Sequence, residues 1–329
     1  MERSSQGRSP GLVRLRATIA LAVAIVCWAS IPLFLKHFST ALDGWTVNAY
    51  RYTIAAAMHF PVILRTHWNG RLPHRLWRRA LLPTVFNIVS QNLWTWAPYF
   101  IDPGLMSFLA RGSIIWSVTG SFLLFPDERP AIRSAQFTLG LGLAAVGYAG
   151  LMAQQGGLAQ KATMWGVLIM LACGVFTAGY SLSVRKVLSD VNPRLAFAVI
   201  ALYTSAKAQA LMLLFGHLTR LVALDVRTAA LLSISAVLGL GIAQVAYYTA
   251  ISHLGVAICS CSMLMASFLT TLASGIVFGE RFTGGQWMAG VLLVAGGISI
   301  IGASRHVGKS EEARPSVEKS RPRPRGQRP

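Results

Sequence analysis

Residues 104–147 read GLMSFLARGSIIWSVTGSFLLFPDERPAIRSAQFTLGLGLAAVG: an apolar run with one arginine, a Glu-Arg pair and a glycine-marked apolar run. Residues 255–297 read GVAICSCSMLMASFLTTLASGIVFGERFTGGQWMAGVLLVAGG and repeat this order at a spacing of 150 to 152 residues. A repeat of this length is half a molecule rather than a solenoid unit, so the sequence predicts a duplication. The matching pairs are Gly104 and Gly255, Glu128-Arg129 and Glu280-Arg281, Gln136-Phe137 and Gln286-Trp287, Gly140 and Gly290, and Gly147 and Gly297.

The composition is that of an integral membrane protein. Of the 329 residues, 54% are hydrophobic and only 12% are charged, so too few polar side chains remain to cover a water-soluble surface. The formal charge of +19 would suit nucleic acid, but the basic residues stand mainly in the tails and in short loops between apolar runs. No folded basic groove is left to follow phosphates. The sequence therefore predicts a lipid bilayer as the surroundings and no nucleic-acid partner.

Ten apolar runs are long enough to cross a bilayer core of about 30 Å as helices. Tight turns at Asp102-Pro103 and Ser252-His253 join the third run to the fourth and the eighth to the ninth. Because each half has an odd number of spans, the second half enters the membrane in the opposite sense to the first. We predict an all-α integral membrane protein with ten transmembrane helices, arranged as two inverted five-helix repeats around a central cavity. The runs are 17–35, 44–64, 80–100, 103–125, 134–154, 163–184, 195–216, 228–251, 254–279 and 283–304.

The segments outside the spans predict the domain organisation and the orientation. A cytoplasmic N-tail (1–16) precedes the first repeat (17–154), and a linker (155–162) leads to the second repeat (163–304). The C-tail (305–329) is basic, has no apolar periodicity and is predicted to be disordered. With the N-terminus inside, the inner segments hold 22 of the 30 Lys and Arg residues and the outer loops hold 5. This bias predicts a multi-pass protein of the cell inner membrane with both termini in the cytoplasm.

Three cations within the predicted spans, Arg51, Arg111 and Lys207, are the strongest functional signal. A charge at membrane depth costs about 2.5 kcal/mol or more, so it usually faces a wet cavity or a partner. All eleven Asp and Glu residues fall outside the predicted spans, so an anionic group on the substrate is the expected partner. This predicts a carboxylate or a phosphate. The alternatives are that Arg51 bonds helix carbonyls or reaches Asp43, that Arg111 meets Asp102, and that Lys207 snorkels to the membrane surface or is neutral when desolvated.

Polar and aromatic side chains at helical spacing occur in the same spans. Asn87, Gln91 and Trp94 stand at i, i+4 and i+7, and such a stripe is not expected to face lipid. Hydrogen bonding between helices is the alternative to ligand contact for each of them. Trp28 and Tyr180 are candidate apolar walls of the cavity. The candidate substrate-binding residues are Arg51, Arg111, Lys207, Asn87, Gln91, Trp94, Tyr203, Gln244, Tyr248, Trp28 and Tyr180.

Motifs of catalysis are missing from the sequence. It contains neither His-Glu-x-x-His nor Gly-x-Ser-x-Gly, and it has no Gly-x-x-x-x-Gly-Lys loop for ATP. The four cysteines lie inside apolar runs without metal-ligand spacing. We therefore predict no enzyme, no cofactor and no metal. Glu128 and Glu280 close spans at the membrane boundary, where capping or fixing a turn is the expected role.

Several short motifs together match a known family pattern: Cys27-Trp28-Ala29-Ser30, Arg51, the two Glu-Arg pairs, Gln136 and Gln286. By these motifs the chain resembles the ten-span branch of the drug/metabolite transporter (DMT) superfamily, whose members have a duplicated EamA-type domain and include multidrug resistance efflux proteins. The resemblance covers about residues 15–305 and implies eight spans around a central cavity, spans 5 and 10 outside it, and export of metabolites or drugs.

Two departures from the family pattern matter. Members commonly carry a proline 13 residues before the Glu of each Glu-Arg pair, where this chain has Ile115 and Ser267. The small four-span members also use a carboxylate in the first span to bind cationic drugs and protons. That mechanism does not transfer to this chain.

Together these features predict a membrane transporter, an exporter of a small amphipathic anionic metabolite that works by alternating access as a monomer or homodimer. One alternative is a broad-specificity multidrug efflux transporter, and another is a flippase of a lipid-linked anion. An alternative of a different class is a membrane-embedded enzyme or sensor that binds its ligand without translocating it.

Overall fold

The computed structural model describes residues 10–101, 106, 109–153, 164–217, 219, 224–278 and 283–306, and every regular element within them is a helix. The first repeat contains α1 (Pro10–Phe38), α2 (Gly44–Trp68), α3 (Leu76–Trp96), η1 (Ala97–Tyr99), α5 (Ser113–Leu124), α6 (Arg129–Ile132) and α7 (Ala135–Ala153). The second contains α8 (Met164–Leu188), α9 (Pro193–Phe215), α11 (Val226–Ala236), the π-helix η2 (Val237–Ile242), α12 (Ala243–Leu254), α13 (Val256–Ser262), α14 (Leu264–Phe278), α15 (Gly284–Gly302) and η3 (Ala303–His306).

Several predicted features lie outside the described residues. They are the turn at Asp102-Pro103, Gly104, the linker 155–162, Glu280-Arg281, and the tails before residue 10 and after residue 306. α1 begins at Pro10, within the predicted N-tail.

Polar side chains cap the helices where the sequence places Asp, Asn or Thr. The Asp43 carboxylate accepts hydrogen bonds from the backbone N–H of Thr46 at 2.9 Å and from its hydroxyl at 2.7 Å, at the start of α2. Burial disfavours ionisation of Asp43, but these bonds outweigh it and lower its pKa. Thr283 and Gln286 form a capping box at the start of α15. These caps fix where the helices begin.

Five helical stretches are long and apolar enough to span a membrane: 11–38, 164–188, 193–215, 226–254 and 284–305. The shorter apolar helices Ser113–Leu124, Ala135–Leu151 and Val256–Thr270 fall within three further predicted spans. α2 and α3 have the length of a span, but each carries arginines that lower its hydropathy. The ten-span count therefore stays a prediction.

Corresponding helices of the two repeats pack against each other in opposite directions. Thr46 at the start of α2 accepts a hydrogen bond from the N–H of His217, just after α9, at 3.3 Å. Farther along α2, His59 packs on Phe197 in the first turn of α9, with ring centroids 5.2 Å apart. α2 and α9 are therefore antiparallel, which is the relation expected of inverted repeats.

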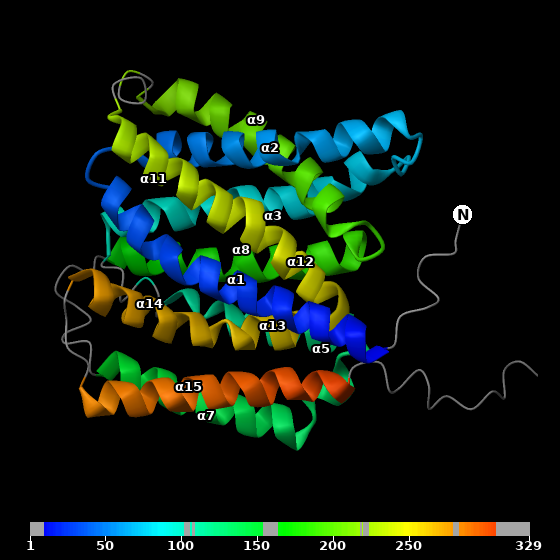
Figure 1. Cartoon of the computed structure of the whole chain (residues 1–329), viewed down its shortest axis with the longest axis vertical. Coiled ribbons are helices and arrows are strands. Elements are labelled where there is room, and N and C mark those ends of the chain that lie inside the picture. The colour runs from blue at the N-terminus through cyan, green and yellow to red at the C-terminus, as the bar shows by residue number, and fades with distance from the viewer. Residues whose placement is uncertain are drawn as a thin grey trace, which may run out of the picture.

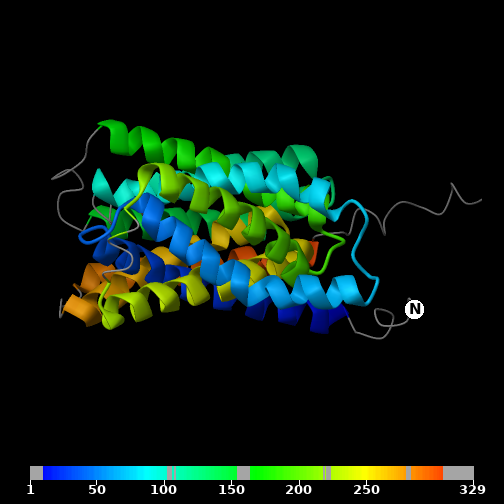
Figure 2. The ribbon, with the colours of Figure 1, turned by 90° about the horizontal axis from the view of Figure 1, so that it is seen from above.

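The ends of the bundle have the same inverted arrangement. In Figures 1 and 2 the start of α1 and the α2–α3 connection lie at one end, and the α1–α2 connection lies at the other. Arg79 in the first turn of α3 forms an ion pair with Asp190, just after α8, so α8 ends where α3 begins. The Arg79 guanidinium also lowers the pKa of Asp190. The second repeat thus runs through the bundle in the opposite sense to the first.

α7 and α15 form an antiparallel pair at one edge of the bundle (Figure 1). A Cβ atom at Gly147 would lie 2.6 Å from the carbonyl oxygen of Ala289, closer than real Cβ atoms come to other atoms. A Cβ atom at Gly140 would lie 2.8 Å from the carbonyl oxygen of Gly296. The missing side chains of Gly140 and Gly147 therefore permit close packing of the two helices.

Two predicted spans are interrupted rather than continuous. In run 103–125 the chain turns at Arg111-Gly112 before α5 begins, and run 254–279 breaks at Met263 between α13 and α14. These breaks occupy corresponding places in the two repeats. The turn predicted at Ser252-His253 lies instead at Gly255, whose φ of +98° favours glycine.

Candidate functional site

A cavity lies in the bundle between the two repeats. The centres of water-sized molecules can occupy about 170 Å³ of it. Since one water needs about 10–15 Å³ on this measure, there is room for roughly ten waters or a small organic molecule. Described residues of α1, α2, α3, α5, α8, η2, α12, α13 and α14 line it, and those of α7 and α15 do not.

Seven of the eleven candidate residues come together around this cavity, from five helical elements and from the turn before α5. They are Trp28, Arg51, Gln91, Trp94, Arg111, Tyr180 and Gln244.

Arg51 on α2 is a buried cation at the cavity wall. Its side chain is 2% exposed, and none of the residues that the structure describes forms a hydrogen bond or ion pair with it. Asp43, one predicted alternative partner, is engaged with Thr46 instead. Burial of an unpaired guanidinium is costly, so this group needs an anion or water in the cavity beside it.

The π-helix η2 gives the Arg51 guanidinium its space. A Cβ atom at Gly239 would lie 2.9 Å from Nη2 of Arg51. The carbonyl oxygen of Gly239 accepts a hydrogen bond from Nε1 of Trp28 at 2.8 Å, and the Trp28 ring packs on Tyr247 with centroids 5.0 Å apart. Single π-helical turns are frequent at functional sites. Here the turn joins the aromatic wall to the buried cation.

Arg111 reaches the cavity from the interruption before α5, but protein atoms hold it. Its Nε donates a hydrogen bond to the hydroxyl of Ser267 on α14 at 3.0 Å. Ser267 is one of the two residues that replace the proline common in the family pattern. Asp102, the predicted alternative partner of Arg111, lies outside the described residues. Arg111 therefore has a protein partner, whereas Arg51 has none among the described part of the chain.

Four candidate residues do not reach the cavity: Lys207, Asn87, Tyr203 and Tyr248.

The reason is that each of these side chains faces a neighbouring helix or the outside of the bundle. Asn87 is completely buried and donates hydrogen bonds to Tyr52 at 2.9 Å and Thr204 at 3.1 Å, which ties α3 to α2 and α9. Tyr203 packs on Trp77, with ring centroids 5.6 Å apart. Tyr248 is buried behind the cavity wall with its hydroxyl bonded to that of Tyr180. Lys207 is half-buried on α9, away from the cavity lining.

Serine and threonine side chains in the cavity wall were not among the candidates. Ser113 and Ser117 on α5, and Thr177 and Ser181 on α8, line the cavity as pairs four residues apart. Four-residue spacing places each pair on one helix face. Such hydroxyl pairs in otherwise apolar helices are the sequence signal that could have identified these four residues. Ser260 and Thr270 in the second repeat also line the cavity.

The lining combines three kinds of group: aromatic rings, neutral hydroxyls and amides, and guanidinium groups. Trp28, Trp94, Tyr180 and Tyr247 supply the rings. No described residue of the lining carries a carboxylate. Aromatic walls accept an apolar body, and Arg51 accepts an acidic group, ideally through two parallel hydrogen bonds. The arrangement suits an amphipathic anion better than an amine.

Comparison with known proteins agrees with the repeated helices. The sequence profile of a family described as "EamA-like transporter family" matches residues 15–153 and again residues 164–302. None of the curated protein sequences matches the chain. One solved structure, described as "Crystal structure of protein", superposes with a TM-score of 0.68 at 20% sequence identity. The superposition covers 89% of this chain and 98% of that one, and at this identity it shows the fold alone.

Proposed function

The chain belongs to the EamA-like transporter family, and from that premise we propose that it transports a small amphipathic anion through the central cavity. Membership makes it a multi-pass membrane transporter with a small-molecule substrate. The anionic character of the substrate and its binding by cavity residues are our proposal.

The observation that carries the proposal is the Arg51 guanidinium, which has no hydrogen-bond or ion-pair partner among the residues that the structure describes. It is buried at the cavity wall, and Gly239 leaves the space that it occupies. A carboxylate or phosphate beside it would replace lost hydration with charge-assisted hydrogen bonds. A cationic substrate would add a second positive charge at the same place. Arg51 thus selects for negative charge on the substrate.

The aromatic and hydroxyl residues of the lining set the rest of the specificity. The tilted rings of Trp28 and Tyr247 pack against each other at one wall, and Gln91 and Gln244 offer amide groups. A cavity with room for roughly ten waters fits a molecule of a similar number of non-hydrogen atoms. We therefore expect a compact substrate with an acidic group on an apolar, preferably aromatic, body.

The inverted repeats support alternating access as the mechanism. When two halves of opposite orientation enclose a site, rocking of one half against the other exposes the site at one end and closes the opposite end. We infer export as the direction, following the family resemblance. We also infer cytoplasmic termini, because 22 of the 30 Lys and Arg residues fall in the predicted inner segments.

Thermal unfolding of the purified full-length protein with four matched probes tests the charge of the substrate. The probes are phenyl phosphate, phenylacetate, benzylamine and benzyl alcohol. We expect the two anions to raise Tm, because a ligand at 100 times its Kd adds about 2.7 kcal/mol of stability. Benzylamine and benzyl alcohol should leave Tm unchanged. A shift with benzylamine that equals or exceeds the shifts with the anions would contradict the proposal.

A further inference from the structure

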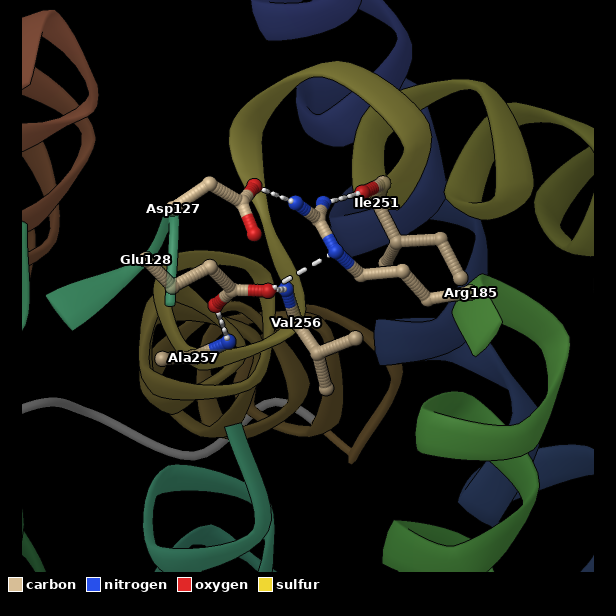
Figure 3. Close-up of polar contacts among 6 residues, drawn as sticks. All are labelled: Asp127, Glu128, Arg185, Ile251, Val256 and Ala257. Carbon is tan, nitrogen blue, oxygen red and sulfur yellow. Dashed lines mark hydrogen bonds and ion pairs between the residues drawn. The ribbon is translucent and has the colours of Figure 1, made fainter. Parts of the chain in front are cut away.

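A charged cluster outside the cavity lining joins the two repeats. Asp127 and Glu128, in the connection between α5 and α6, meet Arg185 of α8 (Figure 3). The Arg185 Nε atom lies 3.0 Å from Oε1 of Glu128, and its Nη2 lies 2.5 Å from Oδ2 of Asp127. Nη1 donates to the carbonyl oxygen of Ile251 on α12. One guanidinium thus holds the carboxylates of both Asp127 and Glu128.

Glu128 also holds the turn that begins α13. It is 1% exposed and accepts hydrogen bonds from the N–H groups of Val256 at 2.9 Å and Ala257 at 3.0 Å. The preceding Gly255 has a φ of +98°, and a Cβ atom there would lie 2.6 Å from Cδ of Glu128. Burial raises the pKa of Glu128, whereas Arg185 and the two N–H groups favour its ionised form. We call Asp127, Glu128, Arg185 and the backbone groups of Ile251, Val256 and Ala257 the Arg185 cluster.

The Arg185 cluster lies one helical turn beyond the cavity on three helices. On α8, Arg185 follows the cavity residue Ser181 by four positions. Ile251 follows Tyr247 by four positions on α12, and Val256 precedes Ser260 by four on α13. Four residues correspond to about 6 Å along a helix. The cluster therefore closes one end of the cavity.

Every bond that the Asp127 and Glu128 carboxylates make in this cluster crosses from one repeat to the other. The two carboxylates belong to the first repeat, and Arg185 and the backbone groups belong to the second. A movement that separates the repeats at this end must break these bonds. Resting on the transport function proposed above, we propose that the Arg185 cluster is a latch, closed in this conformation, which opens when this end of the cavity opens.

The duplication supports a matching element at the opposite end. The family profile matches two segments, which start at residues 15 and 164. Lys36 on α1 and Arg185 on α8 stand the same number of residues after these two starts, so they are sequence counterparts. Pro32, one turn before Lys36, lines the cavity as Ser181 does one turn before Arg185. The sequence counterpart of Glu128 is Glu280, which lies outside the described residues.

Accessibility of one cavity residue from each side of the membrane tests the latch. The reporter is Ser181→Cys in full-length protein whose four native cysteines are replaced by alanine. Sealed right-side-out and inside-out vesicles receive an impermeant anionic methanethiosulfonate. The variant Asn69→Cys, exposed in the α2–α3 connection at the same end, identifies the vesicle side that the cluster faces.

Glu128→Gln and Arg185→Gln should each raise the labelling rate of the reporter from that side by about tenfold or more. A tenfold change corresponds to about 1.4 kcal/mol, less than the cost of leaving a buried charge unpaired. The matched control Arg79→Gln removes the exposed Arg79–Asp190 pair at the same end and should leave the rate unchanged.

If Glu128→Gln and Arg185→Gln fold and the labelling rate of the reporter is unchanged in both, the latch proposal is wrong. The cluster would then serve only to cap α13. If neither variant folds, Asp127→Asn decides, because Asp127 is partly exposed and the Glu128–Arg185 pair remains. It should raise the rate by a smaller factor, and an unchanged rate would overturn the proposal. The assay needs no substrate, so its outcome is separate from that of the thermal test with the four probes.

Discussion

Arg51→Gln is expected to reduce the stabilisation by phenyl phosphate and to leave the ligand-free protein at least as stable as the unaltered one. Charge-assisted hydrogen bonds contribute about 1.5–3 kcal/mol, so Kd should rise by about 10- to 100-fold. The ligand-free protein loses a buried charge that has no partner among the described residues, which removes a desolvation cost. Thermal unfolding with and without the probe measures both effects in one experiment.

Two further variants separate charge from geometry at Arg51. Arg51→Lys keeps the positive charge but loses the planar fork, so its affinity should fall between those of Arg51→Gln and the unaltered protein. Lys207→Gln removes a half-buried cation that lies on α9 away from the cavity lining, and it should change Kd by less than about twofold. Equal loss of affinity in Lys207→Gln and Arg51→Gln would show that the anion is not bound in this cavity.

Gly147→Leu is expected to separate α7 from α15 and to destabilise the protein severely. The new Cβ atom would lie 2.6 Å from the Ala289 carbonyl oxygen and 2.8 Å from the Leu293 backbone nitrogen. Movement of a neighbouring side chain cannot relieve these two collisions, because both are with backbone atoms. Such overpacking costs about 3 kcal/mol or more, which is a large fraction of a typical stability. The measurement is Tm in detergent together with the fraction of monodisperse protein.

The control for Gly147→Leu lies on the same helix. Gly142 of α7 has open space where a Cβ atom would stand, so Gly142→Leu adds the same side chain without a collision. Its Tm should stay within a few degrees of the unaltered value, since exposed substitutions usually change stability by about 0.5 kcal/mol or less. Equal losses in both variants would mean that α7 does not depend on close contact with α15.

Most of the fold could be predicted from the motifs that recur in the two halves of the sequence. The motifs shared by residues 104–147 and 255–297 predicted the duplication and the EamA-type resemblance, and the family match confirms both. The interruptions at Arg111-Gly112 and Met263 could not be predicted, because both lie in apolar runs that are equally compatible with a continuous helix. The predicted role of Glu128 as a cap is confirmed by its bonds to the start of α13.

The candidate site was harder to predict because a sequence does not tell which face of a helix points inward. Tyr247 and Tyr248 are neighbours about 100° apart around α12, and only Tyr247 lines the cavity. Asn87 and Gln91 share a stripe, but Asn87 turns to α2 and α9 while Gln91 faces the cavity. Lys207 was chosen together with Arg51 and Arg111 because all three lie at membrane depth within predicted spans. The rotation of each helix about its own axis decides which of them faces the cavity, and only the packing of the helices determines that rotation.

Solute counterflow in proteoliposomes tests the central claim most directly. Vesicles loaded with unlabelled phenyl phosphate receive radiolabelled phenyl phosphate outside, and uptake is compared for the unaltered protein, Arg51→Gln and Lys207→Gln. The account predicts transient, saturable accumulation of label with the unaltered protein and Lys207→Gln, and none above protein-free vesicles with Arg51→Gln. Equal accumulation with Arg51→Gln and the unaltered protein would contradict it.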